Sequence, residues 1–202
     1  MKRWILGLSV LMFVLIVSAC GGMDNEPNNQ NQDEESKEAT IINKEASEKA
    51  GSTEVVEVEM INSRGEKIGI ATLKQEKTGV NIEIEASDLP KGTHGFHIHE
   101  KGVCEKPDFK SAGEHFNPIG KQHGFDNPEG PHAGDLPNIE VGEDGKVTES
   151  FLNEMVTLQQ GEENSLLRDL GTSLIIHADP DDNISQPAGN AGERIACGVI
   201  KK

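Results

Sequence analysis

Histidines are concentrated in one stretch of this 202-residue chain, and their clustering constrains the fold more than any other feature. The chain has seven histidines, of which six lie between residues 94 and 135 and the seventh, His177, follows a short apolar run much later. The clustered six are His94, His97, His99, His115, His123 and His132. Imidazole is a common metal ligand in proteins, so the clustering indicates a metal-binding protein.

Two local spacings within this stretch suit metal coordination. His97 and His99 alternate as residues on a strand do, so both imidazoles point to one face of a sheet. His132 and Asp135 lie three residues apart in HAGD, which suits a tight loop that offers nitrogen and oxygen ligands to zinc. An isolated His-x-His pair is more often a surface or core pair. The number of histidines together with Asp135 favours metal ligands, and is sufficient for two sites.

The N-terminal segment has the pattern of an export signal. Lys2 and Arg3 precede an apolar run over residues 5–17, which is short for a membrane span and typical of a signal peptide. The run ends in VSAC followed by two glycines, which resembles a bacterial lipobox and predicts a signal peptide over residues 1–19 and lipidation of Cys20. A signal peptide cut elsewhere and an uncleaved anchor remain open, and export follows from all three.

The segment after this signal is polar. Residues 20–53 are dominated by Asn, Gln, Glu and Ser, and their few apolar residues cannot offset the entropy lost on ordering. We therefore predict a disordered tether, with at most a short helix over residues 41–49. The whole chain has a net charge of -16, which argues against nucleic acid as a partner because phosphate binding needs clusters of Lys and Arg. Nothing in the sequence indicates the oligomeric state.

Two cysteines remain after Cys20, at positions 104 and 197. In an exported chain, two cysteines favour a disulfide bond, because such bonds persist in oxidising compartments. Two free buried thiols are the alternative. A bridge between Cys104 and Cys197 would close a long loop that includes most of the histidines.

Apolar and polar residues alternate over much of residues 54–202, which predicts an all-β domain. The predicted strands cover residues 55–61, 67–73, 80–86, 95–100, 136–141, 147–152, 174–177 and 195–200. Residues 158–170 are predicted to be a connection with some helical character. Several short strands separated by turn signals are typical of a β-sandwich or barrel.

Two further stretches, residues 102–135 and 179–193, show no strand or helix period and are predicted to be irregular loops. An irregular loop as long as the first is unusual inside a compact domain. We expect metal ligands and a bridge from Cys104 to hold it in place.

Four stretches of the domain resemble the copper/zinc superoxide dismutase family: GFHIHEKG, SAGEHFNP, HAGDLPNI and GNAGERIACGVI. The resemblance covers about residues 54–202. It implies an all-β fold, namely an eight-stranded Greek-key β-sandwich or flattened barrel with two long irregular loops. It also implies copper and zinc as cofactors and superoxide as substrate.

The resemblance further implies which residues bind the metals. Copper would be held by four histidines: His97, His99, His115 and His177. Zinc would be held by three histidines and one aspartate: His115, His123, His132 and Asp135. His115 would bridge the two ions and act as a catalytic proton donor, whereas His94 would be structural.

Other residues take roles from the same resemblance. Cys104 and Cys197 would form the family's disulfide bond. Arg194 would guide the substrate anion, with a surface salt bridge to Glu193 as the alternative. Asp181 would connect histidines of the two metal groups, with capping of its own DPDDN loop as the alternative.

Two departures from the family pattern concern the substrate channel. The loop over residues 179–193 lacks lysine, and Ala188 stands before Gly189 where the family commonly has threonine. All six expected histidine ligands are present. The departures therefore affect the electrostatics of the channel rather than the metal sites.

The resemblance predicts a superoxide dismutase that converts superoxide to dioxygen and hydrogen peroxide by cycling copper between Cu(II) and Cu(I). It would be attached by lipid to a membrane, outside the cytoplasm. Because the chain is acidic overall, attraction of the anion must be local, from Arg194 and the metals. The alternatives are a non-catalytic, surface-tethered copper/zinc-binding protein and a β-sandwich that holds zinc alone.

Overall fold

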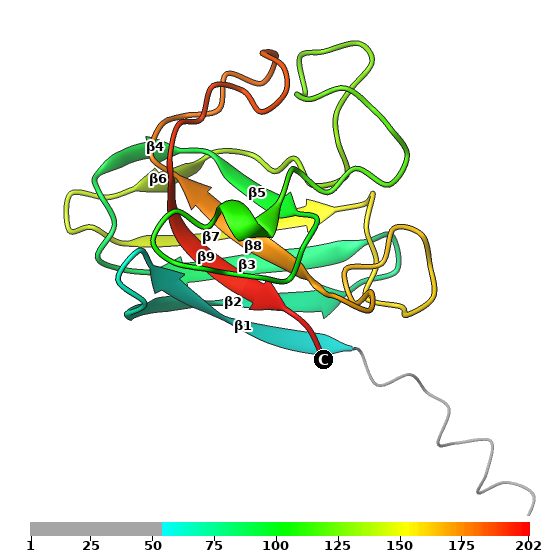
Figure 1. Cartoon of the computed structure of the whole chain (residues 1–202), viewed down its shortest axis with the longest axis horizontal. Coiled ribbons are helices and arrows are strands. Elements are labelled where there is room, and N and C mark those ends of the chain that lie inside the picture. The colour runs from blue at the N-terminus through cyan, green and yellow to red at the C-terminus, as the bar shows by residue number, and fades with distance from the viewer. Residues whose placement is uncertain (1–53) are drawn as a thin grey trace, which may run out of the picture. The chain divides into compact units, whose positions relative to one another are not determined.

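The structure, a computed structural model, describes residues 54–202. This part of the chain is almost entirely β-structure (Figure 1). Its strands are β1 (Val55–Asn62), β2 (Lys67–Gln75), β3 (Val80–Ala86), β4 (Gly92–His94), β5 (Phe96–His99), β6 (Ile139–Val141), β7 (Val147–Asn153), β8 (Thr172–His177) and β9 (Arg194–Ile200). Within residues 54–202 the only helix is the short 3-10 helix η1 (Lys110–Ala112), so the predicted all-β class is confirmed.

The strands form two antiparallel sheets. Seven of them pair in the order β5-β8-β9-β1-β2-β3-β7, and β4 pairs with β6. Strands distant in sequence are neighbours at β5–β8 and at β9–β1, as expected of a Greek-key connection. The large sheet is curled and β6 lies beside β7, which gives the sandwich or flattened barrel that the resemblance implied (Figure 1).

Along the strands of the curled sheet, successive side chains alternate between the core and solvent. In β1, Val58 and Met60 are fully buried, while Glu57 between two buried neighbours is exposed. In β3, Ile82 and Ile84 are fully buried in the same way. Burial of each such side chain contributes about 1.5–3 kcal/mol to folding. One face of these strands therefore builds the core and the other faces water.

Strands β5 and β8 differ because both of their faces are buried. Phe96 and Ile98 of β5 belong to the main core, so His97 and His99 lie on the opposite face. On that face, Ile175 of β8 packs in a second apolar cluster with Phe109, Ala112 and Cys197. The irregular loops thus cover the outer face of β5 and β8, and the histidines of β5 lie beneath them.

The disulfide between Cys104 and Cys197 is present, so the predicted pairing is confirmed. Their Cα atoms lie 5.8 Å apart and 93 residues separate them in sequence. Cys197 is fully buried in β9, whereas Cys104 belongs to the loop that leads to η1. The bond therefore fixes this loop against the sheet beside the second apolar cluster.

Two sequence predictions need correction. Residues 158–170 contain no helix, because Gly161 has a φ of +88° and turns the chain back so that Leu166 N–H donates to Thr157 O. The strand predicted over residues 95–100 is β5, whereas the short strand β4 before it, which pairs with β6 rather than with β8, was not predicted. The described residues therefore contain nine strands, where about eight were predicted.

The predicted signal peptide, lipidated Cys20, polar tether and short helix over residues 41–49 lie outside the described residues. Among residues 54–202, no helix has the length and apolar character needed to cross a membrane.

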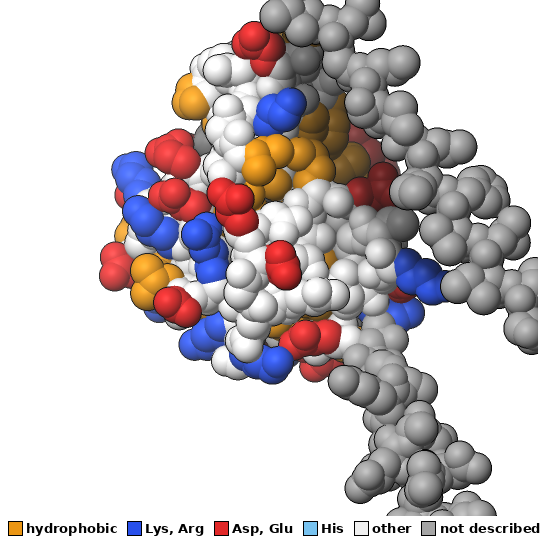
Figure 2. Space-filling model, turned by 90° about the vertical axis from the view of Figure 1, so that its right-hand side faces the viewer, with side chains coloured by type: hydrophobic (Ala, Val, Ile, Leu, Met, Phe, Trp, Pro, Cys, Tyr) orange, Lys and Arg blue, Asp and Glu red, His pale blue; other side chains and the backbone are white. Residues whose placement is uncertain are grey.

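The face shown in Figure 2 carries acidic, basic and apolar side chains, and no histidine is visible on it.

Removing the disulfide should lower the stability of the domain. We expect the Cys104→Ala/Cys197→Ala double variant to lose about 2–5 kcal/mol of unfolding free energy, because the unfolded chain regains the entropy of a long open loop. Chemical denaturation of the metal-free protein measures this loss, and reduction of the unmodified protein should give a similar value. A loss below about 1 kcal/mol would contradict it.

Candidate metal centre

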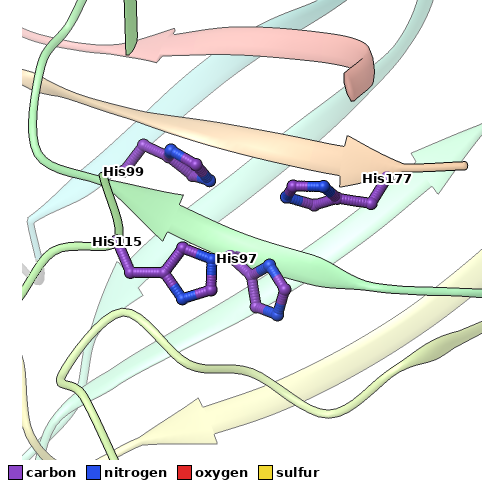
Figure 3. A group of neighbouring side chains, drawn as sticks. All are labelled: His97, His99, His115 and His177. Carbon is purple, nitrogen blue, oxygen red and sulfur yellow. The ribbon is translucent and has the colours of Figure 1, made fainter. Parts of the chain in front are cut away.

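Four histidines from three segments face one buried space (Figure 3). His97 and His99 come from β5, and His177 ends β8, which pairs with β5. His115 comes from the loop after η1 and forms an isolated bridge with His99. One possible ligand atom from each ring lies within 4.8 Å of the others, and all four residues are buried. The structure thus brings together the four histidines predicted to bind copper.

One nitrogen of each ring is already hydrogen-bonded. His99 Nδ1 donates to Gly113 O at 3.0 Å, and His177 Nδ1 donates to Gly192 O at 3.3 Å. His97 Nε2 and His115 Nδ1 each contact a carboxylate, at 2.7 and 2.8 Å. These bonds fix the plane of every ring and select the nitrogen that remains free.

The other nitrogen of each ring has no hydrogen-bond partner among the described residues. These buried atoms are His97 Nδ1, His99 Nε2, His115 Nε2 and His177 Nε2. A buried polar atom without a partner costs free energy, so four at one place require an explanation. Imidazole nitrogens that point at a common centre are the donors that copper and zinc bind, and hydrogen bonds on their far side are typical of metal sites. These residues therefore fit a bound metal ion.

A second group shares His115. The Asp135 Oδ1 atom lies 2.8, 3.1 and 3.3 Å from the Nδ1 atoms of His115, His123 and His132. The other carboxylate oxygen accepts from the backbone N–H groups of Gly124 and His132, at 2.9 Å each. Three nitrogens and one oxygen form a donor set typical of zinc. These are the residues predicted to bind zinc.

Asp181 connects the two groups. Its Oδ2 lies 2.7 Å from His97 Nε2 and its Oδ1 lies 3.0 Å from His123 Nε2. The backbone of Asp181 exchanges two hydrogen bonds with the side chain of Asn138, both 2.9 Å long. Sequence reasoning missed Asn138, although it lies within the HAGDLPNI stretch.

His94 lies outside both groups. Its ring nitrogens are 2.9 Å from His177 O and 2.8 Å from Pro90 O, so both face carbonyl groups rather than the common space. It holds the end of β8 against the segment that leads into β4. The geometry agrees with a structural role.

Burial and charge set the protonation of these histidines. Burial, followed by repulsion from His97, lowers the pKa of His115 to about 4 and that of His177 to about 3. For His123, burial opposes the charge, but hydrogen bonds to Asp135 and Asp181 outweigh it and raise the pKa to about 9. The rings that face the common space are thus neutral near pH 7, with a lone pair free for a metal.

Arg194 begins β9 beside this centre. Its Nη1 donates to Phe109 O at 2.8 Å and its Nη2 donates to Gly113 O at 2.7 Å. Gly113 O also accepts from His99, so one carbonyl connects the guanidinium to a histidine of the four-ring group. Among residues 54–202 Arg194 forms no ion pair, and in particular none with Glu193.

Arg194 also lines a cavity of about 670 Å³. Lys110, Asp108 and Glu193 line it, so two basic and two acidic side chains surround the opening. Lys110 Nζ lies 2.8 Å from an Asp108 carboxylate oxygen. The loop over residues 179–193 lacks lysine, and the lysine in this cavity comes instead from η1.

Comparison with known proteins identifies similar sequences and folds. The family model for copper/zinc superoxide dismutase matches residues 67–200. The chain is 57% identical over 144 residues to superoxide dismutase [Cu-Zn] 1 of Aquifex aeolicus, covering 71% of this chain and 85% of that protein. It is 46% identical over 145 residues to the superoxide dismutase-like protein YojM of Bacillus subtilis, covering 71% and 74%.

Solved structures agree with these sequence matches. A double mutant of a SOD-like protein from Bacillus subtilis superimposes with a TM-score of 0.71 at 46% identity, covering 72% of this chain and 97% of that one. Cu/Zn superoxide dismutase from Brucella abortus superimposes with a TM-score of 0.59 at 29% identity, covering 73% and 99%.

The shifted histidines predict how stability depends on pH in the metal-free protein. The pKa values of His115 and His177 are lower in the folded state, so their contribution is complete above about pH 6.5 and is lost as the pH falls toward 4. The pKa of His123 is higher in the folded state, so its contribution is complete below about pH 6.5 and is lost as the pH rises through 9. Urea denaturation should therefore show the greatest stability near neutral pH, and equal stability at pH 4.5 and 6.5 would contradict this.

Proposed function

The chain belongs to the copper/zinc superoxide dismutase family, and we propose how its own residues carry out the dismutation of superoxide and where they do so. Two superoxide anions and two protons give one dioxygen and one hydrogen peroxide. The observation that carries the proposal is the set of four buried ring nitrogens without a hydrogen-bond partner, with His115 shared between two groups.

Each group takes one metal ion. Copper is held by the four-ring group: His97, His99, His115 and His177. Zinc is held by the group that contains the carboxylate: His115, His123, His132 and Asp135. Copper, when bound, supplies one-electron chemistry because it is stable in two oxidation states, which zinc is not.

His115 is the proton donor in this proposal. Its Nδ1 faces Asp135, which fixes the ring, and its Nε2 faces the four-ring space. Nε2 has no other partner among the described residues, so a proton held there can pass to a basic peroxide anion. His115 therefore acts as a general acid at that atom.

Arg194 attracts and positions the anion. The whole chain has a net charge of -16, so its overall field repels superoxide and attraction must come from nearby positive groups. Two carbonyl oxygens hold the guanidinium, one of which also accepts from His99, and Arg194 lines a cavity from which an anion can reach it.

We also propose that the enzyme works outside the cytoplasm, attached to a membrane by lipid on Cys20. Two observations support this proposal. Residues 1–20 contain two basic residues, then an apolar run, then the sequence VSAC, and a disulfide joins Cys104 to Cys197. In this arrangement residues 1–19 are removed, residues 20–53 form the tether and residues 54–202 form the enzyme. Loss of the membrane fraction in the Cys20→Ser variant would support the anchor, whereas an unchanged distribution would exclude it.

Metal loading tests the proposed chemistry. We expect the purified protein to take up one copper and one zinc per chain, and to consume superoxide only when copper is present. Metal analysis and a superoxide consumption assay on the same sample measure both properties. Copper uptake without activity would select a non-catalytic binding protein, and uptake of zinc alone would select a zinc-stabilised structural domain.

Replacing Arg194 should slow the reaction. We expect Arg194→Ala to lower kcat/KM about tenfold or more, and to weaken its dependence on salt, because a local positive charge no longer attracts the anion. Stopped-flow superoxide consumption at several ionic strengths measures both effects. The control is Lys146→Ala, which removes the same charge from an exposed side chain beside β7. Equal kinetics at low ionic strength would rule out the role of Arg194.

A further inference from the structure

Gln186 bonds to the backbone of a residue 63 positions away. It lies in the loop between β8 and β9, and its side-chain Nε2 donates to His123 O at 2.9 Å. The same amide accepts from His123 N–H through its Oε1, also at 2.9 Å. One planar side chain thus satisfies both backbone groups of His123, as a neighbouring strand would.

His123 depends on this contact. It is fully buried, and its N–H and C=O have no backbone partner among residues 54–202. Removing the amide would leave a buried donor and a buried acceptor unpaired, or would require the loop to move. The amide therefore fixes the backbone of His123, and with it the direction in which its side chain leaves the chain.

Residues that precede Gln186 in the same loop make further contacts with the segment around His123. Asp181 Oδ1 is 3.0 Å from His123 Nε2, and Asn183 O accepts from Asp126 N–H at 3.0 Å. Gly124 has a φ of +99°, and a Cβ there would lie 2.0 Å from Asn183 O. The two loops thus approach closely around His123, which leaves Nδ1 directed at Asp135.

We propose that Gln186 is a positioning residue for the zinc group. It holds His123 so that Nδ1 faces Asp135 before any metal arrives, and it ties the loop carrying Asp181 to that group. The inference rests on the proposed ligand role of His123. Gln186 belongs to neither set of metal ligands, and it acts through the backbone of His123 rather than through the imidazole ring.

Three variants separate positioning from general stability. Gln186→Ala removes both hydrogen bonds to His123 and a third from Nε2 to Ile184 O, whereas Gln186→Glu can still accept from His123 N–H but can no longer donate to His123 O. Ile184→Ala is the matched control, because its exposed side chain lies in the same loop. All are made in the full chain, stripped of metal, and loaded with zinc or cobalt alone.

The readouts are zinc affinity, by competition with a chelator, and the visible spectrum of cobalt, which reports the geometry of the zinc group. We expect Gln186→Ala to bind zinc about 10–100-fold more weakly with an altered cobalt spectrum, Gln186→Glu to fall between, and Ile184→Ala to match the unmodified protein. Unchanged affinity and spectrum in Gln186→Ala would overturn the proposal, even if its melting temperature fell, since that result leaves only a structural role.

If the proposed superoxide dismutase activity is wrong, the zinc measurements and the activity assay give a different combination of results. An unmodified protein that binds zinc tightly but does not consume superoxide when copper-loaded would refute the proposed enzyme and leave the role of Gln186 intact. An unmodified protein that binds zinc without using His123, shown by a His123→Ala variant of equal affinity, would overturn both.

Discussion

The imidazole of His115 lies between two groups of side chains that the rest of the fold brings to it. Its Nδ1 is 2.8 Å from Asp135 Oδ1, and its Nε2 faces His97, His99 and His177 with no hydrogen-bond partner. A single ring can direct one nitrogen into each group only if the plane of the ring is fixed to within a narrow range. The surrounding strands, loops and disulfide are best understood as the means of holding it there.

Each side of His115 is supported by a different part of the chain. Strands β5 and β8 supply a rigid base, because both faces of each strand are buried and three of the histidines are on or at the end of them. The disulfide of Cys197 holds the loop that carries Gly113, whose carbonyl accepts from His99 and Arg194. Asp181 then ties the loop before β9 to both groups. Irregular loops can be long in this domain because these contacts replace strand pairing.

Much of this arrangement was predictable from sequence, and the reasons differ between residues. Period-two alternation predicts the strands that face water on one side, such as β1 and β3. The histidine spacing indicates metal binding, but assignment of each ligand came from family resemblance, because spacing cannot show which loop reaches which strand. The short strand β4 was missed, since it exists only through its pairing with β6.

Contacts made by loop amides were not predictable in the same way. Asn138 and Gln186 are polar residues in polar surroundings, and their importance comes from partners 43 and 63 residues away. Likewise, the sequence shows no lysine in residues 179–193, but only the fold places Lys110 of η1 in the cavity beside Arg194. Long-range contacts of single side chains leave no periodic pattern, so they become visible only in the folded chain.

The central claim is that one imidazole, that of His115, is shared by two metal ions. Electron paramagnetic resonance of the protein with Cu(II) in both groups tests it most directly, because an imidazole bound through both nitrogens transmits magnetic coupling between the ions. The account predicts a strongly coupled pair with little signal near neutral pH. Two independent Cu(II) signals of full intensity would contradict it.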